Sequence, residues 1–75
     1  MMLEVLLVFA MNGGLANVSD RVFTSYGECA IFVNELVKKD VVNSDYGFMF
    51  YSDDGDRFVG QCIEKSEWER YISPK

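Results

Sequence analysis

Two cysteines, Cys29 and Cys62, are the residues of this 75-residue sequence with the most distinctive chemistry. Cys29 falls in the first turn of a predicted helix, where the positive end of the helix dipole favours a thiolate. Cys62 falls on the last predicted strand, with its side chain on the face of the sheet that the helix is expected to cover. The two cysteines could therefore meet. The pair fits three arrangements: two buried thiols packed as small apolar side chains, a structural disulfide, or a redox-active pair.

Catalytic and metal-binding chemistry is poorly represented in the remaining sequence. There is no histidine, which removes the commonest general base and the commonest metal ligand. Asp53, Asp54 and Asp56 gather around one predicted turn, but the spacing of an EF-hand calcium loop is absent. We therefore expect no catalytic residue, no metal site and no cofactor.

The charge of the chain bears on its partners. Twelve acidic and seven basic residues give a net charge of -5, and the basic residues are scattered rather than gathered into a stripe. This distribution disfavours direct nucleic-acid binding and suits association with a basic protein surface. It also leaves an alternative function, an acidic nucleic-acid mimic that inhibits a DNA- or RNA-binding protein of a host.

The first eleven residues are apolar, yet they do not resemble a secretory leader. They contain Glu4, lack a basic segment and run into Asn12-Gly13-Gly14. The run is also shorter than the roughly 20 residues of a membrane-spanning helix. The sequence therefore predicts a strand here, and a soluble, cytoplasmic protein without membrane contact.

Two tight turns predict two hairpins. Asn12-Gly13 and Asp54-Gly55 are dipeptides typical of two-residue turns with positive φ. Turns of that length predict the cross-strand pairs Phe9–Ala16, Leu7–Val18, Leu3–Val22, Glu4–Arg21, Tyr51–Phe58, Met49–Gly60 and Gly47–Cys62.

A helix is predicted over residues 26–39, where Ser25 and Glu28 have the spacing of a capping box. A second, short helix is predicted near the C-terminus. The core-facing stripe of the main helix is predicted to contain Tyr26, Cys29, Ala30, Val33, Leu36 and Val37. Residues 1–75 should thus form a single α+β domain, a four-stranded, mainly antiparallel sheet in ββαββ order with the main helix on one face.

The predicted strands have more apolar surface than one helix can cover, because both faces of the sheet carry apolar residues. The second face must be covered by the C-terminal segment, by a second copy of the chain or by another protein. We therefore predict a non-enzymatic protein-interaction module that binds a protein partner or forms a homodimer. The predicted contact residues are Leu6, Val8, Phe48, Phe50, Val59, Ile63, Trp68 and Tyr71.

Three short segments resemble a known group of proteins. Phe23-Thr24-Ser25 at the helix entry, Cys29 early in the helix and Gln61-Cys62-Ile63 in the last strand are similar to small uncharacterised single-domain proteins of tailed bacteriophages. The resemblance implies a viral or bacterial origin and supplies no activity. In a viral setting, the partner would be a host protein in the host cytoplasm.

Overall fold

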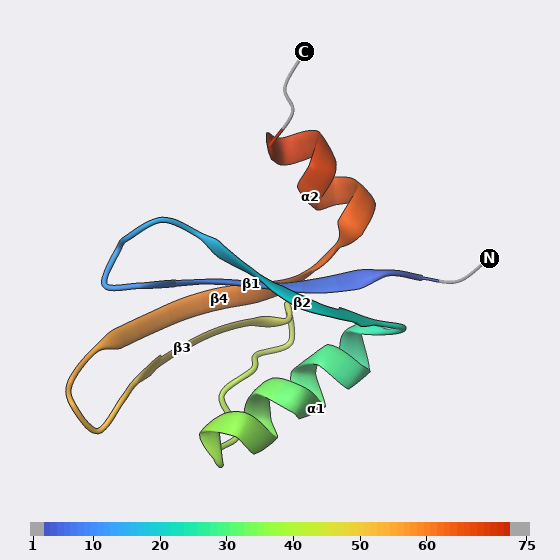
Figure 1. The fold of residues 1–75 in the computed structure, drawn as a ribbon. Helices are drawn as coiled ribbons and strands as arrows, with labels where there is room; N and C mark the ends of the chain where they lie inside the picture. The colour runs from blue at the N-terminus through green and yellow to red at the C-terminus, as the bar shows by residue number, and fades with distance from the viewer. Residues whose placement is uncertain (1–2, 73–75) are drawn as a thin grey trace.

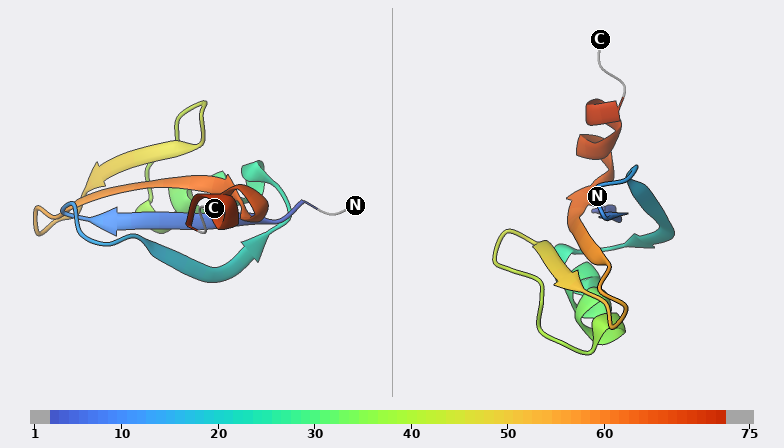
Figure 2. Two further views of the ribbon diagram at one scale, coloured as in Figure 1. Left: turned by 90° about the horizontal axis from the view of Figure 1, so that it is seen from above. Right: turned by 90° about the vertical axis from the view of Figure 1, so that its left-hand side faces the viewer.

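The computed structural model describes residues 3–72 and contains one four-stranded sheet and two helices (Figure 1). The elements are β1 (Val5–Met11), β2 (Asn17–Phe23), α1 (Tyr26–Val37), β3 (Gly47–Tyr51), β4 (Arg57–Glu64) and α2 (Lys65–Ile72). All neighbouring strands are antiparallel, in the order β2-β1-β4-β3. Helix α1 packs on one face, whereas α2 stands away from the sheet on the other side (Figure 2). The predicted α+β class and ββαββ order are confirmed.

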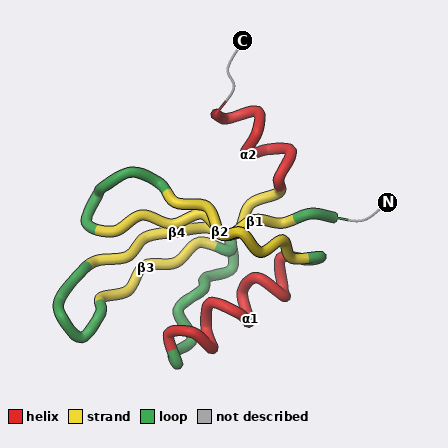
Figure 3. Tube along the Cα trace, viewed as in Figure 1, coloured by secondary structure: helices red, strands yellow, loops and turns green. Residues whose placement is uncertain are grey.

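The two central strands, β1 and β4, are neighbours in the middle of the sheet (Figure 3). Every residue of β1 pairs with a residue of β4. Leu7 lies opposite Cys62, and Phe9 lies opposite Gly60. Because side chains alternate along a strand, Val5, Leu7 and Phe9 point toward α1. The buried cluster between sheet and helix consists of Val5, Leu7, Phe23, Cys29, Val33, Phe48 and Cys62.

Helix α1 begins with a capping arrangement close to the predicted one. The Ser25 hydroxyl accepts a hydrogen bond from the Glu28 amide at 3.0 Å, and the Glu28 carboxylate accepts one from the Thr24 amide at 3.0 Å. The Thr24 hydrogen bonds lower the pKa of Glu28. The helix ends at Val37, because Lys38 has a left-handed conformation and its amide donates to the Asn34 carbonyl. The predicted end at residue 39 was therefore two residues too late.

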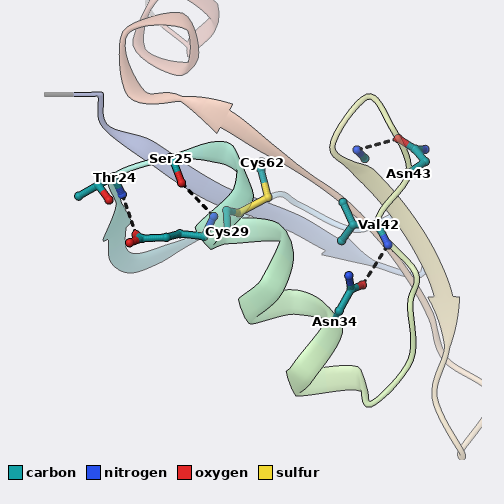
Figure 4. The surroundings of a disulfide bond; sticks show 9 residues. Thr24, Ser25, Cys29, Asn34, Val42, Asn43 and Cys62 are labelled. Atoms are coloured by element: carbon teal, nitrogen blue, oxygen red, sulfur yellow. Dashed lines mark hydrogen bonds between the residues drawn. A yellow bond between two sulfur atoms is a disulfide. The ribbon is translucent and has the colours of Figure 1, made fainter.

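Two asparagines direct the segment that joins α1 to β3. The Asn34 side-chain oxygen accepts a hydrogen bond from the Val41 amide at 2.8 Å. It accepts a second one from the Val42 amide at 3.1 Å (Figure 4). The Asn43 amide donates to the Gly47 carbonyl at 2.8 Å, and its side-chain oxygen accepts from the Gly47 amide. These bonds hold Val41 and Val42 against the core and start β3 at Gly47.

The face of α1 that packs on the sheet differs from the predicted stripe. Phe32, which lay outside that stripe, packs on Phe23 with ring centroids 5.3 Å apart. The Arg21 guanidinium lies 5.2 Å from the Phe32 ring, a cation–π geometry. Leu36, which the stripe included, is 67 % exposed, because the last turn of α1 borders an open apolar pocket.

The register of the first hairpin also differs from the prediction. Asn12 and Gly13 form the expected turn with positive φ. Strand β2, however, begins only at Asn17, which pairs with Phe9. The Asn12 amide donates to the Arg57 carbonyl, and the Asn12 side chain accepts from the Arg57 amide and donates to Asp56. This turn is therefore tied to the other hairpin, and β2 separates from β1 beside it. The predicted pairs Phe9–Ala16, Leu7–Val18, Leu3–Val22 and Glu4–Arg21 are wrong.

In the second hairpin the loop contains three residues rather than two. The Ser52 amide donates to the Asp56 carbonyl, the Gly55 amide donates to the Ser52 carbonyl, and Gly55 has φ +89°. This is the common three-residue loop, a turn closed by a left-handed glycine. It shifts the register by one residue, so Phe50 pairs with Phe58. The predicted pairs Tyr51–Phe58, Met49–Gly60 and Gly47–Cys62 are wrong.

Gly60 is the glycine for which the fold leaves least room, since the Phe48 ring lies across it. A Cβ atom at this position would overlap that ring and come 2.6 Å from the Val8 carbonyl oxygen. We expect Gly60→Ala to lower the free energy of unfolding by about 1–3 kcal/mol, as overpacking does. Urea denaturation followed by circular dichroism measures the change.

Gly47→Ala is the matched control, because a Cβ atom there meets no atom closer than 3.7 Å. Equal destabilisation by the two substitutions would contradict the close packing of Phe48 on Gly60.

Candidate interaction surfaces

The face of the sheet opposite α1, called here the helix-free face, presents a group of apolar side chains to solvent. Strand pairing places them together: Val18 lies beside Val8, Met49 lies beside Val59, and Val22 lies beside Leu6, which is itself buried. Five of these side chains are between 39 % and 61 % exposed: Val18, Val22, Met49, Tyr51 and Val59. Such clustered exposure is typical of an interaction surface.

Helix α2 does not form a lid over this face. It follows β4 directly, and the Lys65 amide donates to the Glu4 carbonyl at 2.8 Å. From there it projects away from the sheet (Figure 2). The rings of Trp68 and Tyr71 stack on each other with centroids 5.9 Å apart, and Tyr71 is 77 % exposed. Within residues 3–72, the C-terminal segment therefore leaves the exposed apolar side chains of this face uncovered.

The structure places the six predicted contact residues of the strands on two different faces of the sheet. Val8, Val59 and Ile63 lie on the helix-free face as predicted, and so does Leu6, which is buried rather than available for contact. The assignment of Phe48 and Phe50 to this face is wrong.

Both phenylalanines point toward α1. Phe48 belongs to the buried core, and the Phe50 ring stacks on Phe58 with centroids 5.1 Å apart. The one-residue shift in the second hairpin exchanges the faces, so Met49 and Tyr51 take the positions expected for the phenylalanines. The segment Asp53-Asp54-Gly55, read as a three-residue loop, was the signal that would have identified them.

An apolar pocket lies between α1 and the sheet, with a volume of about 250 Å³. It is lined by Leu7, Phe9, Val33, Leu36, Val37, Phe48, Phe50 and Phe58. No lining residue is a hydrogen-bonding or ionisable one. The pocket can therefore accept an apolar group, but it has no side chain that would orient a substrate or transfer a proton.

Cys29 and Cys62 are joined by a disulfide bond (Figure 4). Their Cα atoms are 6.1 Å apart, and both side chains are buried. The bond links the first turn of α1 to the central strand β4. Of the three arrangements considered from the sequence, the structure contains the disulfide.

Two small groups of ionisable side chains lie at opposite ends of the sheet. At the end near α2, burial together with the carboxylates of Glu64 and Glu67 raises the pKa of Tyr26, whose ring stacks on Tyr46. At the other end, Asp56 is hydrogen-bonded to Asn12, while Asp53 and Asp54 are exposed.

Within residues 3–72, no group of three or more Cys, Asp or Glu side chains is placed to hold a metal ion. In the same part of the chain, neither helix has the length and apolarity needed to cross a membrane.

Comparisons with known proteins yield no relative. No protein-family model matches the sequence, no curated protein matches it, and no solved structure matches the fold.

The disulfide should contribute a large part of the stability of so short a chain. It joins residues 33 positions apart, and chain entropy assigns such a loop about 3–4 kcal/mol. We expect a reductant to lower the free energy of unfolding in urea by that order. The Cys29→Ala/Cys62→Ala double variant should show similar stability to the reduced protein and no response to reductant. Equal unfolding midpoints for oxidised and reduced protein would contradict this role.

Proposed function

We propose that this protein is a small, non-enzymatic interaction module that binds another protein through its helix-free face. One observation carries the proposal: exposed apolar side chains gather on a sheet face that α1 does not cover and α2 does not cross. Sheets with apolar residues on both faces are normally covered on both. A protein partner would supply the second cover.

The apolar pocket supports a binding role over a catalytic one. Its lining offers no acid, base or nucleophile, so it adds apolar contact surface rather than chemistry. The disulfide engages both cysteines in a structural bond. These features favour an interaction module as the function of this domain.

The apolar face and the charge of the chain bear on which partner would bind. A second copy and a different protein both fit an apolar face, and the net charge of -5 favours a basic partner over an acidic one. A cytoplasmic location and a viral origin stay predictions from the sequence. The acidic nucleic-acid mimic also stays a prediction, which rests on the net charge and the exposed carboxylates near Asp53.

Val59→Asp tests the proposed face, because Val59 is exposed at its centre and lies opposite Ala10 and Met49. A carboxylate buried without a partner weakens an interface strongly, so we expect at least about tenfold weaker self-association or partner capture. Light scattering over a concentration series measures self-association. Quantitative cross-linking in the native cell measures partner capture.

Ile31→Asp is the matched control, since Ile31 is an exposed apolar residue on α1, on the other side of the molecule. The proposal predicts that this control behaves like the unmodified protein. If both folded variants associate as the unmodified protein does, the helix-free face is not the binding surface.

A further inference from the structure

The sheet has two edge strands, β2 and β3, and they differ in how well they resist pairing with another strand. Strand β2 is irregular, with a bulge opposite the segment between Leu6 and Val8, and it carries Asp20 and Arg21. Bulges and charges are the usual means of blocking an edge. Strand β3 carries no charge between Gly47 and Tyr51, and its pairing with β4 is regular.

The hydrogen bonds at both ends of β3 show which of its backbone groups face β4. The Cys62 amide donates to the Tyr46 carbonyl, and the Ser52 amide donates to the Asp56 carbonyl. In an antiparallel pair every second residue bonds to the neighbouring strand. Residues 46, 48, 50 and 52 therefore bond toward β4, and residues 47, 49 and 51 direct their amides and carbonyls outward.

One of these three outward positions is already occupied. Asn43 bonds both backbone groups of Gly47, its amide donating to the carbonyl and its side-chain oxygen accepting from the amide. Among residues 3–72, no such partner is found for the outward groups of Met49 and Tyr51. The free edge thus offers two amides and two carbonyls at the spacing of an extended strand.

Charges at both ends of this edge indicate the chemistry of a partner strand. Asp45 precedes β3, Asp53 and Asp54 follow it, and all three are exposed. If the β3 strands of two copies paired antiparallel about Phe50, Asp45 of each copy would lie opposite Gly55 of the other. Each Asp45 would then be one position away from Asp54. Like charges brought this close across a strand pair are destabilising, whereas opposite charges are favourable. The edge therefore disfavours a second copy and favours a strand with basic ends.

We propose that the β3 edge pairs with an extended segment of a basic partner protein, in which alternating apolar residues are flanked by Lys or Arg. This inference rests on the proposed function, because the added strand would extend the helix-free face and place its own side chains beside those of Met49 and Tyr51. Main-chain hydrogen bonds supply affinity in this mode, and side chains supply specificity.

Two synthetic peptides with capped ends test the proposal. One has the sequence Lys-Lys-Val-Thr-Val-Thr-Val-Lys-Lys, and the other has Glu in place of every Lys. The proposal predicts that the Lys peptide binds at least about tenfold more tightly, and that its affinity falls as salt rises from about 0.05 to about 0.5 M. In two-dimensional NMR spectra, the largest amide shifts should occur at Met49 and Tyr51. Equal affinities, or shifts centred elsewhere, would overturn the proposal.

Two variants of the protein separate backbone pairing from charge. Met49→Pro removes an outward amide and keeps the β3–β4 hydrogen bonds, so this variant should no longer bind the Lys peptide. The double variant Asp53→Lys/Asp54→Lys removes no backbone amide. It should reduce or reverse the preference for the Lys peptide. This variant still tests the proposal if Met49→Pro does not fold. A concentration-dependent dimer that Met49→Pro dissociates, without peptide binding, would assign the edge to a second copy and overturn the proposal.

Val22→Asp distinguishes failure of this inference from failure of the proposed function. Val22 lies on the helix-free face but on β2, at the opposite edge of the sheet. If Val22→Asp and Val59→Asp weaken partner capture while neither peptide binds, the proposed function stands and the edge inference is wrong. If the Lys peptide binds the edge while both variants capture partners normally, the edge inference stands and the helix-free face is not the binding surface.

Discussion

The uninterrupted pairing of β1 with β4 determines where the other elements lie. These strands are separated by most of the chain, yet every residue from Val5 to Met11 has a partner on β4. Their register brings Leu7 opposite Cys62, which directs Cys62 toward α1 and within reach of Cys29. It also leaves β2 and β3 as the two edges. The position of the disulfide and the free edge of β3 both depend on this pairing.

Local sequence signals predicted the elements well. The cap at Ser25, the turn at Asn12-Gly13 and the periodicity of the helix are local features, and each corresponds to an observed element. Strand order was not predictable, because no local sequence pattern indicates that β1 pairs with a strand some fifty residues away. The roles of Asn34 and Asn43 were not predicted for the same reason, since their hydrogen-bond partners become neighbours only in the folded chain.

The candidate surface was predicted in part, and the errors share one physical cause. Side chains alternate between faces, so a one-residue shift in register exchanges every contact residue of a strand. Val8, Val59 and Ile63 were placed correctly because β1 and β4 were read with the right alternation. Phe48 and Phe50 were misplaced because the loop before β4 contains three residues. The exposed residues Met49 and Tyr51 were missed for the same reason.

The disulfide has a consequence for how this molecule would respond to mechanical force. Cys29 and Cys62 enclose most of α1, all of β3 and much of β4 in a covalent loop, whereas β1 and β2 lie outside it. Tension applied at the two termini would pass directly from one cysteine to the other. The 33 intervening residue steps, roughly 110 Å of extended chain, would not lengthen while the bond is intact. Stretching would therefore unfold β1, β2 and α2. Strand β3 and the segment between α1 and β3 would carry no load.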